Sequence, residues 1–236
     1  AARARQLAGP WEECPHNPLI TQTDPEGAIQ RTGHGKFVRT PAGDWYCLFL
    51  CGRNNEGPWT TLGRETALEP VTWTADGWPL INGGAGPSTT QAFPALAPHP
   101  WPEVPARDHF DGPALSVEWQ WVRSSSPSDW SLADRPGHLR LWTVSADPSR
   151  LQGRNMLLRR EQSHHFEASC LLDFPVSIPG PQAGLVSYYG MNNHLMLVRC
   201  WQGGSLVRLV ENRNGQVRTR AALPVPPGPL ELKVSV

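Results

Sequence analysis

The sequence lacks an excess of charge of either sign, because 21 Lys and Arg side chains balance 21 Asp and Glu among its 236 residues. A balanced chain has no basic stripe of the kind that binds nucleic acid or an anionic membrane surface. It also lacks an apolar run near the roughly 18 residues of a membrane-spanning helix, and no apolar signal core follows Ala1–Arg5. We therefore expect neither nucleic acid nor a membrane as a partner.

Generic catalytic signatures are also missing, since the sequence has no Gly-x-Ser-x-Gly elbow, no His-Glu-x-x-His pair and no phosphate-binding loop. Its five cysteines form no regular framework, and Cys47 and Cys51 stand four apart without a nearby histidine pair. Buried free thiols are therefore expected rather than a zinc site. No cofactor is called for. With no export signal visible, the free thiols favour a cytoplasmic location.

Trp, Pro and Gly are abundant, with 11, 25 and 22 residues respectively. Turn residues at this density interrupt helices, and no stretch shows a convincing helical period, so an all-β fold of short strands is predicted. One predicted hairpin joins 37–40 to 45–50. A second joins 71–73 to 78–80, where Pro79 indicates an edge strand. Each Trp is either core filler or a flat face on which a sugar ring can stack.

Residues 82–107 divide the chain, because a Gly pair and six prolines leave little scope for regular structure. We expect a stiff linker there, between a first domain over 1–81 and a second over 108–236. The strands predicted in the second domain are 116–122, 139–144, 155–160, 166–174, 183–189, 195–201, 206–211, 216–222 and 230–236. This spacing suggests a β-sandwich, with Asn214-Gly215 as a tight hairpin turn. A strand at the very end of the sequence suggests that the sandwich is truncated.

Two polar segments beside glycine are the candidates for chemistry: 30–35, which contains His34, and 62–66, which contains Arg64. The guanidinium of Arg64 is a rigid fork of donors that can hold a carboxylate and a sugar hydroxyl together. The structural alternative for Arg64 is a local ion pair with Glu65 or with another surface carboxylate. For His34 the alternative is a core histidine satisfied by a backbone carbonyl. The residues by themselves leave these alternatives open.

Eleven segments carry a resemblance that covers nearly the whole chain. Seven of them, in this order and spacing, resemble the later part of a glycoside hydrolase family 43 catalytic domain, in particular that of its two-domain β-xylosidases: Gly9–Glu12, Asn17–Ile20, Gly33–Gly35, Gly43–Tyr46, Leu62–Thr66, Pro70–Trp73 and Gly77–Pro79. The other four resemble the C-terminal concanavalin-like sandwich of that group: Phe110–Asp111, Trp119–Trp121, Asp134–Leu141 and Gln182–Tyr189.

The resemblance implies an all-β fold in which the last blades of a five-bladed β-propeller precede an incomplete concanavalin-like β-sandwich. It also implies a fragment of an inverting exo-glycosidase that removes xylose, with arabinofuranose as a companion, from xylo-oligosaccharides. In this family an Asp is the base, a Glu is the acid and a second Asp tunes the acid. The acid and base carboxyls of inverting enzymes stand about 6.5–9.5 Å apart.

No catalytic residue is assigned, because the three catalytic carboxylates of the family lie upstream of the segment that matches Gly9–Glu12. The early acids of this sequence fall outside the matching positions: Glu12, Glu13, Asp24 and Glu26. The whole chain is therefore expected to be a fragment whose acid and base belong to other polypeptide.

Two positions do match the site of the family, and both are assigned to substrate binding. His34 corresponds to the histidine near the propeller axis, and Arg64 corresponds to the arginine that touches the substrate and the base. Some members carry a central ion, so the resemblance admits calcium, although no residue here calls for a metal. It also admits a homo-oligomer of the full-length protein. The alternative from another class is a non-catalytic carbohydrate-binding β-sandwich protein that holds glycan on Trp faces.

Overall fold

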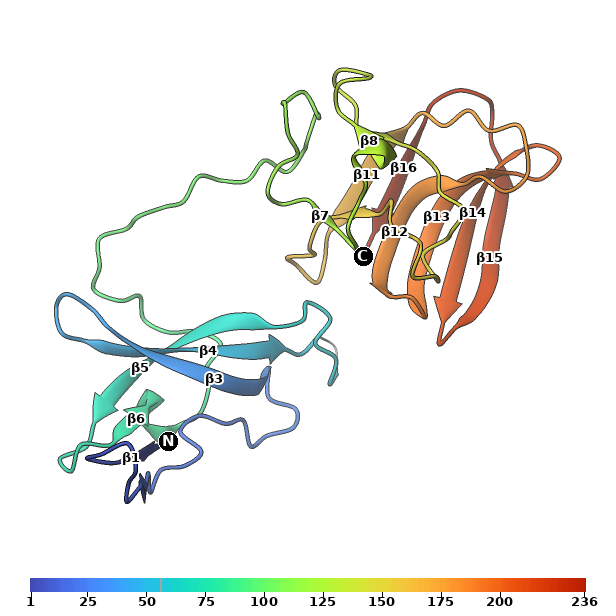
Figure 1. The fold of residues 1–236 in the computed structure, drawn as a ribbon. Coiled ribbons are helices and arrows are strands. Elements are labelled where there is room, and N and C mark those ends of the chain that lie inside the picture. Colours follow the sequence, from blue (N-terminus) through green and yellow to red (C-terminus); the bar gives the residue numbers. More distant parts are fainter. Residues whose placement is uncertain (56) are drawn as a thin grey trace. The chain divides into compact units, whose positions relative to one another are not determined.

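The computed structural model describes residues 1–55 and 57–236, and the chain divides into two compact units. The first unit is Ala1–Pro102 with Gln162–His164, and the second is Glu103–Glu161 with His165–Val236. Regular structure in the described residues is almost entirely strand, which confirms the all-β prediction (Figure 1). The described helices are single 3-10 turns, and neither has the length or hydropathy to cross a bilayer.

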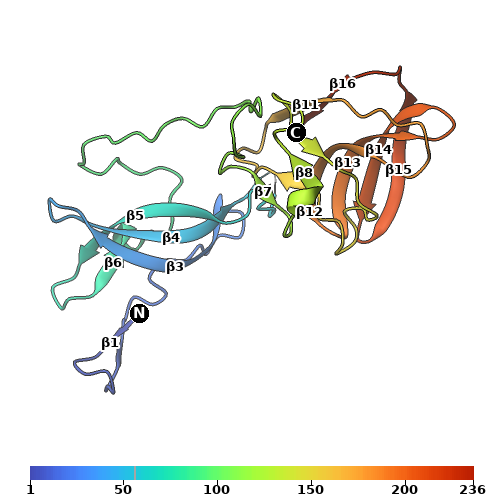
Figure 2. The same cartoon turned by 45° about the horizontal axis from the view of Figure 1, so that its top comes forward.

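A four-stranded antiparallel sheet forms the body of the first unit (Figure 2). Its strands, in order across the sheet, are β3 (Ile29–Arg39), β4 (Trp45–Arg53), β5 (Glu65–Trp73) and β6 (Pro79–Ile81). Strands that follow one another in sequence are neighbours in space, as in a propeller blade. Both predicted hairpins are confirmed, and Pro79 lies in the edge strand as expected. A short separate hairpin pairs β1 (Ala2–Arg3) with β2 (Glu12–Glu13).

The core of this unit lies on one face of the sheet, because alternate residues of a strand point to the same side. Cys47, Phe49 and Cys51 of β4 alternate in this way and are buried, and Leu19 and Ile20 pack against them. Burial raises the pKa of the Cys47 and Cys51 thiols. The prediction of buried free thiols is confirmed for four of the five cysteines, the exception being the half-buried Cys170.

The chain after β6 folds back onto the sheet and is attached to it by hydrogen bonds to a buried carboxylate. Glu69 of β5 is 0% exposed, and it accepts hydrogen bonds from the N–H of Ser88 (2.6 Å), the Ser88 hydroxyl (2.9 Å) and the side-chain amide of Gln91. The same amide donates to Asn82 Oδ1 at 3.1 Å, in the 3-10 turn η1 (Asn82–Gly84). The first residues of the expected linker are thus bound to the first unit.

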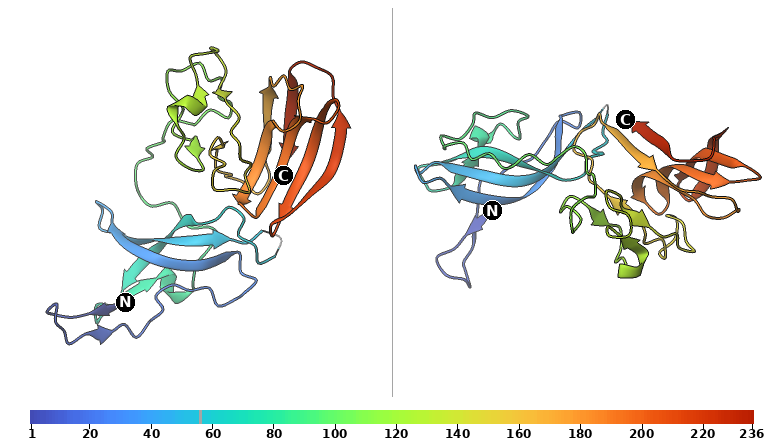
Figure 3. Two further views of the ribbon diagram at one scale, coloured as in Figure 1. Left: turned by 45° about the vertical axis from the view of Figure 1, so that its right-hand side comes forward. Right: turned by 90° about the horizontal axis from the view of Figure 1, so that it is seen from above.

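The second unit is built around another four-stranded antiparallel sheet (Figure 3). Its strands, in order, are β12 (Ala183–Gly190), β13 (Asn193–Trp201), β14 (Ser205–Arg213) and β15 (Gln216–Pro224). Three strand pairs accompany it: β11 (Glu167–Leu172) with β16 (Leu230–Ser235), β7 (Gln120–Trp121) with β10 (Leu157–Leu158), and β8 (Trp130–Ser131) with β9 (Arg140–Leu141).

The turn between β14 and β15 confirms the tight hairpin predicted at Asn214-Gly215. Both residues are left-handed, with φ of 54° and 81°, as a type I′ turn requires. The core of this unit lies under the same sheet, where Met196, Val198 and Val210 pack together on adjacent strands.

The strand predicted over 116–122 is shorter than expected, because only Gln120–Trp121 pairs with another strand. The chain turns just before it, with the N–H of Trp119 bonded to the Ser116 carbonyl at 3.0 Å. The Trp119 indole N–H donates to Asp108 Oδ2 at 2.7 Å. Tertiary contacts therefore override the local preference for an extended chain.

Candidate substrate-binding site

His34 lies in an irregular stretch of β3. The pairing of β3 with β4 shifts register twice, between Gln30 and Gly33 and again between Gly33 and Lys36. Bulges of this kind re-aim side chains and are frequent beside active sites. His34 itself has a left-handed backbone, with φ of 54°, which is uncommon for a residue with a side chain. Its side chain is exposed, so the alternative of a core histidine is wrong.

Arg64 is presented by a tight turn that precedes β5. The turn is closed by a hydrogen bond from the N–H of Gly63 to the carbonyl of Thr60, at 3.1 Å. Gly63 has a φ of 78°, a conformation that glycine adopts without a steric cost. Leu62 is 8% exposed and anchors the turn in the core, while Arg64 two residues later is exposed. The turn thus buries the Leu62 side chain and leaves the Arg64 side chain in solvent.

The carboxylate next to Arg64 is already bound by a different arginine. Arg53 of β4 holds Glu65 with two bonds, Nε to Oε2 at 2.8 Å and Nη2 to Oε1 at 2.9 Å. These bonds hold the pKa of Glu65 below its ordinary value. The alternative of a local Arg64–Glu65 ion pair is therefore wrong. Among the described residues, neither Arg64 nor His34 has a hydrogen-bond or ion-pair partner.

Strand register brings these two segments to the same end of the sheet. Leu50 of β4 pairs with Gly33 on one side and with Thr66 on the other. Gly33 and Thr66 therefore lie at the same level of the central strand. His34 directly follows Gly33, and Arg64 stands two residues before Thr66. His34 lies in β3 and Arg64 lies in the turn that precedes β5, so the two residues flank β4 from opposite sides.

A side-chain contact that the sequence analysis did not identify joins the two segments. Arg31, at φ of 57°, lies in the first irregular stretch of β3, and its Nη1 donates to Thr60 Oγ1 at 2.6 Å. The two residues are 29 positions apart. No local pattern in the sequence indicates such a contact, because it depends on the register of β3 and β5 across β4.

The acidic side chains of this sheet are committed to structural bonds. Glu65 is held by Arg53, and a carboxyl with a lowered pKa is poorly suited to act as a general acid. Glu69 is enclosed by its donors from Ser88 and Gln91. In residues 1–55 and 57–236, no group of three or more His, Cys, Asp or Glu side chains is placed to hold a metal ion.

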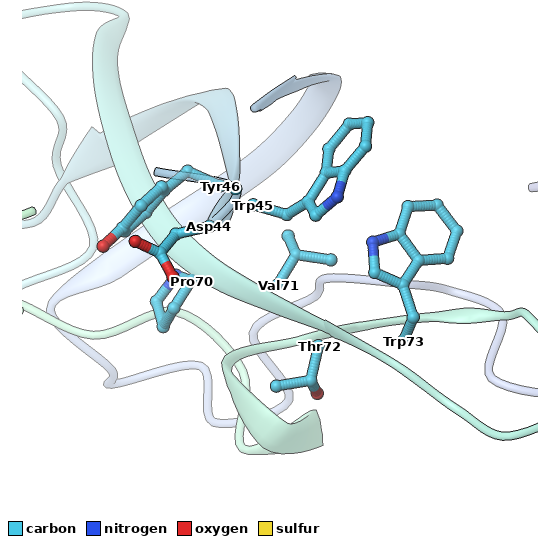
Figure 4. A pocket seen from close by; sticks show the side chains of 8 residues that line it. Asp44, Trp45, Tyr46, Pro70, Val71, Thr72 and Trp73 are labelled. Carbon is cyan, nitrogen blue, oxygen red and sulfur yellow. The ribbon is translucent and has the colours of Figure 1, made fainter. Parts of the chain in front are cut away.

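A surface groove of about 400 Å³ lies at the other end of β4 and β5. Figure 4 shows the indoles of Trp45 and Trp73 beside Val71, with Asp44 and Tyr46 along the same strands. His34 and Arg64 are not among its lining residues. From Leu50 to Trp45 is five residues, or about 17 Å along an extended strand. The groove is therefore separate from the end of the sheet that carries the predicted site.

Two protein-family models match the chain. Residues 107–236 match the β-xylosidase C-terminal concanavalin A-like domain, and residues 1–79 match glycosyl hydrolases family 43. The chain belongs to glycoside hydrolase family 43. The partial propeller and the concanavalin-like sandwich implied by the resemblance are thereby confirmed as the architecture of this family 43 chain.

Relatives of the family 43 chain differ in the sugar that their names specify. It is 34% identical over 209 residues to the non-reducing end α-L-arabinofuranosidase BoGH43B of Bacteroides ovatus, covering 88% of this chain and 40% of the relative. It is 38% identical over 209 residues to a xylan 1,3-β-xylosidase of Vibrio sp., covering 83% and 38%. The crystal structure of the GH43 protein BlXynB of Bacillus licheniformis matches with a TM-score of 0.94 at 47% identity, covering 98% of this chain and 45% of that one. The chain spans less than half the length of each of these proteins.

Proposed function

We propose that this chain is part of an exo-acting glycoside hydrolase that releases xylose, and arabinofuranose as a companion activity, from xylo-oligosaccharides. The observation that carries the proposal is the pair of unpartnered, exposed side chains, His34 and Arg64, at one end of a family 43 blade. The β-xylosidase and arabinofuranosidase names of the relatives support the choice of pentosides.

The proposed mechanism is a single displacement with inversion, in which this chain binds the sugar and other polypeptide supplies the acid and base. The Arg64 guanidinium donates to a sugar hydroxyl and to the base carboxylate, which fixes both in one plane. The His34 ring hydrogen-bonds the sugar and the acid. Arg64 is available for this role because the neighbouring Glu65 forms its ion pair with Arg53. Acid and base carboxyls about 6.5–9.5 Å apart leave room for the attacking water.

The test uses a longer polypeptide that joins this chain to the sequence upstream of Ala1, assayed on an aryl xyloside. We expect Arg64→Ala to lower kcat/KM about 100-fold, since a hydrogen bond from a charged group is lost in the transition state. Arg39→Ala is the matched control, because Arg39 lies at the opposite end of β3 over Trp45. Equal turnover in Arg64→Ala and Arg39→Ala would remove Arg64 from the site.

A second candidate is carbohydrate binding without hydrolysis, which the groove beside Trp45 and the 45%-exposed Trp73 favours. Its supporting result is affinity of the longer polypeptide for xylo-oligosaccharide that Trp73→Ala abolishes, with no sugar released over hours. Hydrolysis that survives Trp73→Ala would reject it in favour of the first proposal.

A further inference from the structure

We infer that Arg31 and Thr60 are positioning residues that set the spacing between His34 and Arg64. The inference rests on the proposed function, because it concerns the same site. Neither residue is expected to touch the sugar. Their hydrogen bond, at 2.6 Å, is the described side-chain link between the irregular stretch of β3 and the turn that presents Arg64.

The backbone of Arg31 is left-handed, with φ of 57°. A left-handed residue other than Gly, Asn or Asp is strained, and such strain persists only where surrounding contacts enforce it. Arg31 follows Gln30, whose side-chain amide donates to the carbonyls of Asp24 and Gly27 at 2.8 Å each. This fixes the chain before the first register shift. The Arg31–Thr60 hydrogen bond then ties Arg31 to the turn that precedes β5. The backbone is therefore held in place three residues before His34.

Thr60 is fitted tightly over the central strand, β4. A Cβ atom added to Gly52 would lie 2.8 Å from Thr60 Cγ2, so the Thr60 methyl group occupies the space that glycine leaves. Gly52 pairs with Gln30, the neighbour of Arg31. The Thr60 side chain therefore has two separable functions: its methyl group packs on β4, and its hydroxyl accepts from Arg31.

Thr60 is linked to Arg64 through the backbone of the turn. The Thr60 carbonyl closes the turn to Gly63, and Arg64 is the next residue. Extension of the β4–β5 register beyond the Cys51–Glu65 pair puts Arg64 level with Gly52. Arg31, Thr60 and Arg64 thus surround the same point of the central strand. A shift of the turn that follows loss of the Arg31–Thr60 bond would move Arg64 away from His34.

The experiment separates the two functions of Thr60 in the longer polypeptide, assayed on an aryl xyloside. Thr60→Val keeps the methyl group and replaces the hydroxyl with a second methyl, whereas Thr60→Ser keeps the hydroxyl and loses the methyl group. Because small misplacements of binding groups are costly to turnover, we expect Thr60→Val to lower kcat/KM about tenfold, mainly in kcat, and Thr60→Ser to stay within about twofold of the parent. Melting temperatures of the two variants should agree within about 2 °C.

A double-mutant cycle tests whether Arg31 acts through Thr60. Arg31→Ala and Thr60→Val remove the same bond, so the double variant should lose about as much as either single one, about tenfold rather than a hundredfold. Arg31→Lys, which retains a donor, should recover part of the loss. A multiplicative double variant, or a loss in Arg31→Ala far above that in Thr60→Val, would mean that Arg31 touches the substrate and would overturn the inference.

Arg64→Ala in the same series distinguishes failure of the inference from failure of the proposed function. If Arg64→Ala loses activity and Thr60→Val retains it fully, the positioning role is wrong and the site stands. If Arg64→Ala also retains full activity, the assigned site is wrong and the positioning role falls with it.

Discussion

Around β5, pairing between individual side chains decides which groups remain available to a ligand. Glu65 is bound by Arg53 and Glu69 by Ser88 and Gln91, so both acids of this strand are satisfied within the unit. Arg64 is left with a full set of unpaired donors in water, at little cost because it is exposed. A binding arginine needs this condition, since a guanidinium already held by a carboxylate would have to break that pair first.

The pKa of Glu65 depends on its pairing with Arg53. The Arg53 guanidinium lowers it from an ordinary value near 4.5, first by its hydrogen bonds and then by its charge. We expect a carbon-detected NMR titration of the Glu65 carboxyl to give a midpoint below 4.5. Arg53→Gln should raise the midpoint toward the ordinary value, and Arg39→Gln, the matched control, should leave it unchanged. A midpoint indifferent to Arg53→Gln contradicts the assignment.

The same pKa shift fixes how the ion pair contributes to stability at different pH. A carboxyl with a lowered folded-state pKa stabilises the fold above its unfolded pKa, and this contribution is lost as the pH falls through the folded pKa. The relevant window therefore lies below about pH 4.5. Side-chain exposures of 45% for Arg53 and 30% for Glu65 keep the effect small. We estimate about 0.5 kcal/mol at neutral pH, after screening by solvent.

At the scale of elements, the attachment of residues 82–91 to the blade depends on Glu69. Glu69→Gln keeps the shape of the side chain but turns one acceptor oxygen into a donor, which then faces an N–H of Ser88 or Gln91. We expect this variant to destabilise the first unit by about 2 kcal/mol. Hydrogen exchange at the Ser88 amide should accelerate, because the weakened network around position 69 holds residues 82–91 less firmly on the sheet. Glu13→Gln is the control, since Glu13 is exposed. Equal Ser88 protection in both variants would show that Glu69 does not anchor the segment.

The elements that the sequence predicted well are those with a local cause. Asn214-Gly215 specifies its own turn through left-handed backbone, and Pro79 restricts its strand to an edge. The features that could not be predicted arise from partners distant in sequence. Glu69 and Ser88 are 19 residues apart, and Arg31 and Thr60 are 29 apart. Periodicity reports which face a residue occupies but carries no information about its partner across the fold.

His34 and Arg64 remain predicted site residues, and the structure adds the local geometry that the sequence could not supply. Resemblance to family 43 selected His34 and Arg64, and in the described residues His34 is exposed while Glu65 pairs with Arg53 and not with Arg64. The strained backbone of His34 and the two register shifts, one before it and one around it, have no signature in composition or alternation. They follow from how β3 pairs with β4, where Gly33 and Gly35 allow the strand to deviate.

At the scale of the whole molecule, the amount of exposed surface is the informative quantity. The chain exposes 16232 Å². Two separate compact domains of half its mass would together expose only about 12,700 Å² by the usual scaling of area with mass. Part of the excess is apolar: Leu195, Leu209 and Leu223, on one face of the β12–β15 sheet by register, are 46%, 37% and 66% exposed. Exposed leucines gathered on one sheet face mark apolar surface of the kind that normally lies against another protein surface.

We therefore expect residues 1–236, produced alone, to self-associate at micromolar concentration. Light scattering after size-exclusion chromatography should show species larger than one chain. Leu209→Lys/Leu223→Lys replaces apolar surface with charge on that face and should shift the distribution toward monomer. Gln202→Lys/Gln216→Lys adds the same charge at exposed polar positions and should shift it much less. A monodisperse monomer of the parent chain would contradict the expectation. Equal effects of both double variants would mean that net charge governs association, and that the leucine face does not.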